Sequence, residues 1–296
     1  MSEAGRRTTS RRDLSKRDRF EEISPDVGVL DEAAFDEAMA DDPDAALALL
    51  ADLTGATDEG LRLLARRLAG RVIVDLARTG EQRRRGIGRL RTAPLRLADG
   101  DIDLDASHDA LVSLAAGRAP DPDDVRVRAW DRPDTALCLL VDRSGSMAGD
   151  RLAAAAVAAA SVLFRTPEDC SVVAFADQAI VLQSQGERRP PDDVVSDLLR
   201  LRGFGVTDLG LALRCAARQL ERSRAGRRIV ILMSDCRSTA GGDPAADAAA
   251  VPELVVLAPE GDTADAEALA RGAGARTTSL AGPTSVPDAL VRVLDR

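Results

Sequence analysis

The stretch Ala136-Leu137-Cys138-Leu139-Leu140-Val141 is followed directly by Asp142-Arg143-Ser144-Gly145-Ser146. Six apolar residues in a row are typical of a strand that is buried on both faces, as in a parallel sheet. One carboxylate and two hydroxyls therefore stand where a buried strand opens into a loop. Oxygen donors in this arrangement suit a hard divalent cation, so the segment indicates metal-dependent binding more than bond-breaking chemistry.

The composition sets broad limits on the class of protein. A chain of 296 residues can hold one large domain or two modest ones, and with 45% apolar but only 2% aromatic residues its core must be aliphatic. The net charge of −9 argues against a general nucleic-acid binder. We find neither a secretory signal pattern nor a run of 18 apolar residues, so we expect no membrane partner and a cytoplasmic location.

Composition and periodicity divide the chain into three parts. Residues 1–26 are polar and Arg-rich, which predicts a disordered basic tail. Residues 27–132 predict a mostly helical N-terminal region. A segment rich in Pro and Asp, residues 118–134, marks the start of a second domain that we place at residues 133–296.

Within the N-terminal region, apolar residues recur every three or four positions. This spacing predicts helices over Asp31–Met39 and Pro43–Leu53, followed by a long helix that Thr57 caps and that runs through Leu76. We expect one face of the long helix to carry Leu61, Leu64, Leu68, Val72 and Leu76.

Two charged segments follow the long helix. The Arg-rich stretch 83–89 is interpreted as a loop between helices, although it has the charge to grip an anionic surface. Asp99, Asp101, Asp103 and Asp105 alternate before a predicted helix at 107–116. They lack the Gly and Glu of a calcium-binding loop, so we interpret them as a strand or turn that leads into that helix.

From residue 135 onward, short apolar strands alternate with helical segments. This alternation predicts an α/β fold, a Rossmann-like, mainly parallel sheet with helices on both faces. Binding sites in such sheets lie beyond the carboxyl ends of the strands. The predicted strands are 136–141, 171–175, 179–182, 229–233, 254–257 and a weak edge strand at 277–280; the predicted helices are 151–165, 192–201, 208–222, 263–271 and 285–294.

Three segments meet at this predicted edge. The first carries Asp142, Ser144 and Ser146, the second supplies Thr207, and the third supplies Asp235. All five side chains are oxygen donors, as Mg²⁺ or Mn²⁺ requires, and hydroxyls leave the ion electrophilic enough to accept one more carboxylate from outside. Zinc is disfavoured, because the chain has a single histidine and no thiolate cluster.

This pattern resembles the metal-ion-dependent adhesion site of von Willebrand factor A domains. The three motifs stand here as Asp142–Met147, Gly205–Asp208 and Ser234–Cys236, and the likeness covers about residues 133–296. The resemblance implies that the metal is touched directly by the three hydroxyls, and that the two carboxylates support it through water or hydrogen bonds. The hydroxyls are those of Ser144, Ser146 and Thr207, and the carboxylates are those of Asp142 and Asp235.

Cys236 departs from the family pattern, which commonly has glycine at this position. The departure leaves the metal-binding oxygens intact but puts a tight turn after Asp235 in doubt. We favour the interpretation that Cys236 is a small residue that the turn tolerates. The alternative hypothesis is that oxidation of Cys236 perturbs the site.

Further interpretations of the motif fit the residues less well. Asp142, Ser144 and Ser146 on their own also suit a capped helix start, but Thr207 and Asp235 favour the metal site. A serine hydrolase would need a base, and the only histidine, His108, lies upstream. A P-loop would need Gly-Lys-Ser/Thr, whereas the only lysine is Lys16 in the tail. A metal-dependent phosphatase stays possible in principle, but no clear general acid or base accompanies the carboxylates.

The layout of the whole chain resembles CoxE-like proteins that work with MoxR-type AAA+ ATPases, and more distantly the D subunit of magnesium chelatase. The resemblance implies a non-enzymatic, metal-dependent module that binds an Asp or Glu of a protein partner and assists such an ATPase in acting on a client. The alternative is a non-catalytic subunit of a chelatase-type metal-insertion complex. A third possibility is an interaction domain whose metal is incidental.

Overall fold

The computed structural model describes residues 8–82, 89–95, 101–121, 124–131, 135–143, 149–201 and 205–294. The chain forms two compact units, one made of residues 1–82 together with 135–296 and the other of residues 83–134. No helix in the described ranges is both long enough and apolar enough to cross a membrane.

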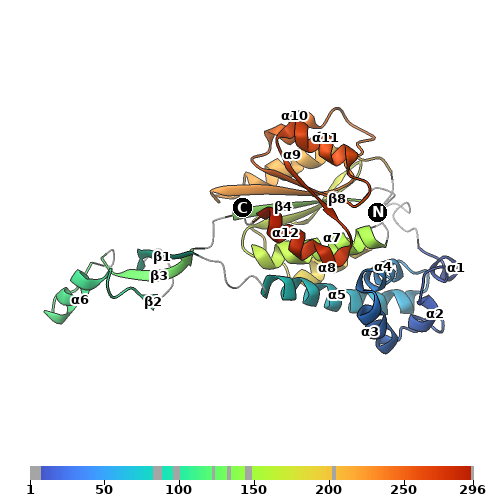
Figure 1. Ribbon diagram of the computed structural model, residues 1–296, viewed down its shortest axis with the longest axis horizontal. Helices are drawn as coiled ribbons and strands as arrows, with labels where there is room; N and C mark the ends of the chain where they lie inside the picture. Colours follow the sequence, from blue (N-terminus) through green and yellow to red (C-terminus); the bar gives the residue numbers. More distant parts are fainter. Residues whose placement is uncertain are drawn as a thin grey trace. The chain divides into compact units, whose positions relative to one another are not determined.

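A six-stranded sheet lies at the centre of the larger unit (Figure 1). Its spatial order is β6-β5-β4-β7-β8-β9, and every neighbouring pair is parallel except β5 with β6. The predicted mainly parallel sheet is therefore confirmed, including the short turn after β5 and the edge position of the last strand. The strands are β4 (Thr135–Asp142), β5 (Cys170–Phe175), β6 (Ala179–Gln183), β7 (Arg227–Met233), β8 (Leu254–Pro259) and β9 (Arg276–Leu280).

Side chains alternate along the central strands and so build two separate cores. In β4, Leu137, Leu139 and Val141 belong to one apolar cluster, whereas Cys138 and Leu140 belong to the other. All five are at most 1% exposed. Both faces of the sheet must therefore be covered by helices, which explains why the strand is an unbroken apolar run.

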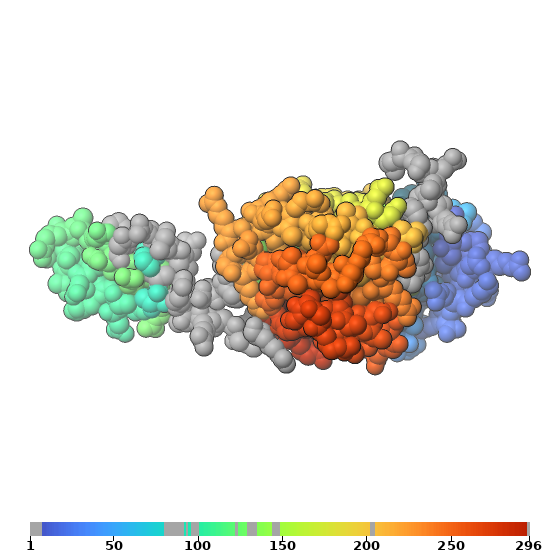
Figure 2. All heavy atoms as spheres, turned by 90° about the horizontal axis from the view of Figure 1, so that it is seen from above, coloured from blue at the N-terminus to red at the C-terminus, as the bar shows by residue number. Residues whose placement is uncertain are grey.

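Helices cover the two faces in separate layers (Figure 1). One layer contains α7 (Asp150–Arg165), α8 (Pro191–Arg200) and α12 (Val286–Leu294). The other contains α9 (Leu209–Leu220), α10 (Ala245–Ala250) and α11 (Ala264–Ala273). The sequence did not predict α10, which has only six residues. The face seen in Figure 2 is formed largely by the segments from α9 to the C-terminal helix.

The N-terminal helices add a third layer over α7 and α8. They are α3 (Glu32–Asp41), α4 (Pro43–Leu53) and α5 (Glu59–Gln82), of which α4 contacts α7 and α5 contacts both α7 and α8. The sequence predicted a boundary that separates these helices from the sheet domain. Instead, their apolar faces share one core cluster with α7 and the sheet, because α7 is buried on its outer side as well.

Two details of α5 differ from the predicted helix. Asp58, not Thr57, caps its start, since the Asp58 carboxylate accepts a hydrogen bond from the backbone N–H of Leu61 at 2.6 Å. Leu64 is 38% exposed and does not share the buried face. Smaller side chains, Ala65 and Ala69, occupy that face instead, because α5 packs closely on α7.

Residues 8–26 correct the prediction of a disordered tail. They contain α1 (Arg11–Leu14) and α2 (Phe20–Ile23), and the side chains of Leu14, Phe20 and Ile23 are at most 1% exposed. Three apolar residues are enough to anchor this polar segment in the core of α3 to α5. Residues 1–7 lie outside the described ranges.

The smaller unit, residues 83–134, was expected to be part of a mostly helical region. It contains a three-stranded antiparallel sheet of order β1-β3-β2, formed by β1 (Arg89–Pro94), β2 (Asp101–Ile102) and β3 (Arg126–Asp131), with α6 (His108–Ala115). Most of the Arg-rich stretch, residues 83–88, lies outside the described ranges, as does Asp99.

The later aspartates of the alternating run do lead into α6, as expected. Asp103 accepts hydrogen bonds from Thr92, Arg128 and the backbone N–H of Ala106. These bonds fix the turn before α6 and hold the pKa of the Asp103 carboxyl below its usual value.

Candidate functional site

Asp142 and Asp235 lie at the same edge of the sheet, where β4 and β7 end side by side. The hydroxyl of Ser234 donates a hydrogen bond to the Asp142 carboxylate at 2.6 Å and accepts one from the backbone N–H of Cys236 at 2.9 Å. Asp142 is 3% and Asp235 is 9% exposed. Two carboxylates are thus held close together, almost out of solvent, by the turn that follows β7.

The segment that carries Thr207 joins this edge through its backbone. The N–H of Asp208 donates to the carbonyl of Ala176, directly after β5, and the carbonyl of Thr207 accepts from the N–H groups of Thr239 and Ala240. Since residues 239–240 follow the third motif along the chain, these bonds tie the second motif to the third. The predicted convergence of Asp142, Thr207 and Asp235 at one edge therefore has a continuous hydrogen-bonded frame.

Asp208 fixes the position of this loop. Its carboxylate caps α9 by accepting a hydrogen bond from the backbone N–H of Leu211 at 2.8 Å. Gly241, which has a φ of +78°, packs directly against that carboxylate, and a Cβ atom there would lie 2.6 Å from Oδ1. A Cβ at Gly241 would therefore press on the carboxylate that caps α9, and the left-handed backbone at this position also favours glycine.

The donors in this part of the chain fit a divalent cation only if hydroxyls contribute. Among the described residues no group of three or more His, Cys, Asp or Glu side chains is arranged to hold a metal. Thr207 is only 3% exposed, and within the same ranges its hydroxyl makes no hydrogen bond. The bonds that tie this loop to residues 239 and 240 are made by the Thr207 backbone, so its hydroxyl is not needed to hold the loop. Ser144 and Ser146 lie outside the described residues.

A comparison with known protein families matches residues 137–238 to the von Willebrand factor type A domain. The chain contains a von Willebrand factor A domain. The match spans β4 to the loop after β7 and therefore includes all three motifs. A search of the curated proteins gave no match.

Solved structures that match part of this chain share little sequence with it. An aerotolerance-related membrane protein from Bacteroides fragilis is 17% identical, with a TM-score of 0.44 over 54% of this chain and 98% of that one. BatB from Bacteroides thetaiotaomicron is 19% identical, with a TM-score of 0.41 over 54% and 97%. Proximal thread matrix protein 1 from the mussel byssus, with a zinc-occupied MIDAS motif, is 16% identical, with a TM-score of 0.40 over 54% and 47%.

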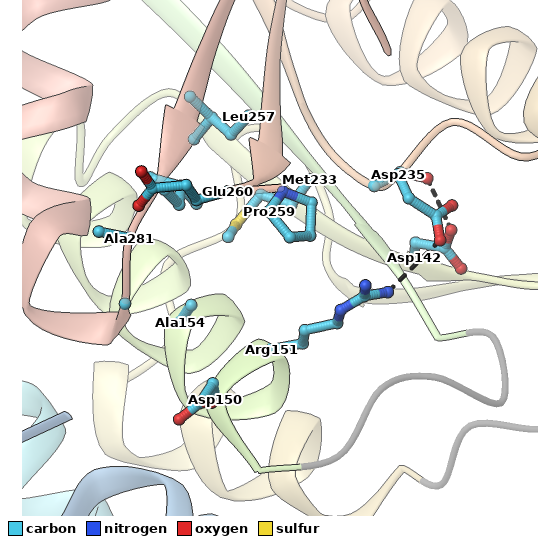
Figure 3. A pocket seen from close by; sticks show the side chains of 13 residues that line it. Asp142, Asp150, Arg151, Ala154, Met233, Asp235, Leu257, Pro259, Glu260 and Ala281 are labelled. Atoms are coloured by element: carbon cyan, nitrogen blue, oxygen red, sulfur yellow. Dashed lines mark hydrogen bonds and ion pairs between the residues drawn. The ribbon is translucent and has the colours of Figure 1, made fainter. Parts of the chain in front are cut away.

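The von Willebrand A domain also has a guanidinium at this edge that the sequence did not indicate. Arg151, in the first turn of α7, points toward Asp142 and Asp235 (Figure 3). Its side chain lies 3.4 Å from the carboxylate of Asp235 and 3.1 Å from that of Asp262. A positive charge here partly neutralises the acidic edge. The sequence signal was weak, since an arginine early in a helix is usually a surface residue.

A second unforeseen contact links the N-terminal helices to the same edge. Asp52 of α4 accepts a hydrogen bond from the backbone N–H of Gly149 at 2.9 Å and pairs with Arg17 at 2.5 Å. Gly149 has a φ of +53° and follows Ser144 and Ser146 closely in the chain. The N-terminal layer therefore contacts the von Willebrand A domain at the segment that begins α7.

Cys236 keeps the tight turn that its replacement of glycine had put in doubt. Its φ is +63°, in the left-handed region that glycine favours. The thiol is 7% exposed, and burial, together with the charges of Asp235 and Asp142, raises its pKa to about 12. A buried, protonated thiol reacts slowly, so the oxidation hypothesis loses support and the tolerated small residue is favoured.

The backbone strain at Cys236 can be measured with two variants. Cys236→Gly is expected to be more stable than Cys236→Ala by about 1 kcal/mol, because only the alanine keeps a Cβ in the left-handed conformation. Both variants lose the thiol, so their difference isolates the backbone effect. Thermal unfolding by calorimetry is the measurement, and equal stability of the two would show that the turn carries no strain.

Proposed function

We propose that this chain is a magnesium-dependent protein-binding module whose metal is held by Asp142, Ser144, Ser146, Thr207 and Asp235. The single observation that supports this most is that Asp142 and Asp235, both nearly buried, lie at the sheet edge to which backbone hydrogen bonds tie Thr207, whose hydroxyl forms no hydrogen bond with a described residue. Donors that are all oxygen favour Mg²⁺, with Mn²⁺ as an alternative ion. A metal ion held largely by hydroxyls keeps enough positive charge to bind an Asp or Glu of a protein partner.

Binding, not catalysis, is the function we propose. In the described part of the chain, no histidine, lysine or reactive thiol lies at this edge to act as a base or nucleophile. The only lysine, Lys16, follows α1, so the chain carries no standard P-loop lysine of its own. We therefore propose that a MoxR-type AAA+ ATPase supplies the ATP-dependent step in the cytoplasm, and that this chain recruits the client protein.

Replacing Thr207 by valine tests the metal site. The valine keeps the shape of the side chain and removes only the hydroxyl, while the hydrogen bonds that hold the loop are made by the Thr207 backbone. We expect Mg²⁺ affinity, measured by isothermal titration calorimetry, to fall about tenfold or more. Thr277→Val, an equivalent change on the exposed edge strand β9, should leave it unchanged. Equal affinities for both variants would exclude Thr207 as a ligand.

The partner is tested by affinity capture from the native host. An AAA+ ATPase identified by mass spectrometry should be retained in Mg²⁺ and released by EDTA. The Thr207→Val variant should capture less of it than Thr277→Val does. Metal-dependent recruitment would be contradicted if the same amount of the ATPase were retained in EDTA as in Mg²⁺, and by Thr207→Val as by Thr277→Val.

A further inference from the structure

A cavity of about 240 Å³ opens beside the proposed metal site (Figure 3). It lies at the carboxyl ends of β7, β8 and β9, against the first turns of α7. Asp142 and Asp235, which we assign to the metal, also line this cavity. A group that occupied it would therefore lie next to the carboxylate that the metal binds.

The inner wall of the cavity is apolar. Met233, Leu257 and Leu280 from three strand ends line it together with Ala154 of α7, and each of these residues is less than 9% exposed. Its volume falls below the roughly 300–1,000 Å³ of pockets that hold drug-sized ligands. A cavity of this size suits one long side chain better than a small-molecule ligand.

The rim of the cavity is acidic. Asp150 and Glu260 both line it, both are exposed, and neither forms an ion pair with any described residue. Arg151 is the only cation among the lining residues, and its guanidinium already contacts Asp235 and Asp262. An incoming acidic side chain would be repelled by the two exposed carboxylates, whereas a cation would be attracted.

An apolar wall combined with an acidic rim matches the chemistry of a long basic side chain. Lys and Arg pack their methylene groups against apolar surface while the charged end stays near water. We propose that this cavity receives a Lys or Arg side chain of the same partner whose Asp or Glu binds the metal, one or two residues away from that acid. The inference rests on the proposed function and adds the class of sequence that the site recognises.

In the test, a library of displayed peptides is selected for binding to the full-length protein in Mg²⁺. Each peptide has one fixed central Asp, and the positions around it are random. We expect Lys and Arg to be enriched within two residues of the Asp. For a selected peptide, replacing that Lys by norleucine, which keeps most of the apolar chain, should weaken binding about fivefold at low salt. The difference should shrink as the salt concentration rises, because the rim charges are exposed.

Two variants of the protein test whether the preference for Lys arises at the rim of the cavity. The double variant Asp150→Asn with Glu260→Gln should bind the Lys and norleucine peptides equally. Glu221→Gln, at the end of α9, should keep the preference for Lys. Peptides that bind in a Mg²⁺-dependent way without enrichment of basic residues would overturn this inference and leave the proposed function standing. A selection that yields no Mg²⁺-dependent peptide would overturn both.

Discussion

Replacing Gly241 by alanine is expected to destabilise the larger unit by about 2–3 kcal/mol, from the left-handed backbone and the loss of a helix cap. A Cβ at this position would lie 2.6 Å from the carboxylate of Asp208, which caps α9. The carboxylate must then shift, which weakens its cap on α9 directly after Thr207. We expect the melting temperature to fall by about 5–10 °C and Mg²⁺ affinity to fall with it.

The neighbouring residue provides the control. A Cβ at Gly242 meets no heavy atom within 4 Å, and its φ lies outside the left-handed region. Gly242→Ala should therefore change stability by no more than about 0.5 kcal/mol, as at most surface positions. If thermal unfolding and calorimetry give the same values for both variants, Gly241 does not pack against the Asp208 carboxylate as the structure describes.

A chain that begins at residue 133 is expected not to fold stably. Twelve residues of α7 are buried, and its outer side is covered by α4 and α5. Removing that layer exposes apolar surface of α7 and α8. At about 25 cal/mol per Å², roughly 200–400 Å² of such surface costs about 5–10 kcal/mol, which rivals the roughly 5–15 kcal/mol net stability of a typical domain. It also removes the bonds from Asp52 to Gly149 and from Asp44 to Thr284.

Circular dichroism is used to monitor thermal unfolding and to measure how cooperative it is. A matched deletion, in which a flexible linker replaces residues 83–134, should still unfold cooperatively, because that segment forms a compact unit of its own. A 133–296 chain that unfolds cooperatively near the wild-type temperature would restore the domain boundary that the sequence predicted.

The sheet and its order of elements could be predicted because its strands are buried on both faces. An apolar run such as that of β4 or β7 is too short to span a membrane and too uniform for a strand with one face in water. The strands of the smaller unit were missed for the opposite reason. In β1 and β3 arginines alternate with apolar residues over only six positions, a weaker signal than an unbroken apolar run, and β3 lies in the Pro- and Asp-rich segment that was interpreted as a domain boundary.

The meeting of Asp142 and Asp235 at one edge could be predicted because parallel strands end side by side. The metal-binding roles of all five side chains stay predictions; they are those of Asp142, Ser144, Ser146, Thr207 and Asp235. The contact of Asp52 with Gly149 could not be predicted, since the two residues are 97 positions apart and no local pattern links them. The buried tail was also missed, because its few apolar residues are too sparse to form a periodic signal.

Anomalous X-ray diffraction from crystals soaked in Mn²⁺ tests whether a divalent cation binds at this edge of the sheet. We expect one strong manganese peak at the carboxyl ends of β4 and β7, within about 2.5 Å of the Thr207 hydroxyl and of the Ser144 and Ser146 hydroxyls. A manganese peak elsewhere on the molecule, or none at this edge in a saturating soak, would contradict this expectation.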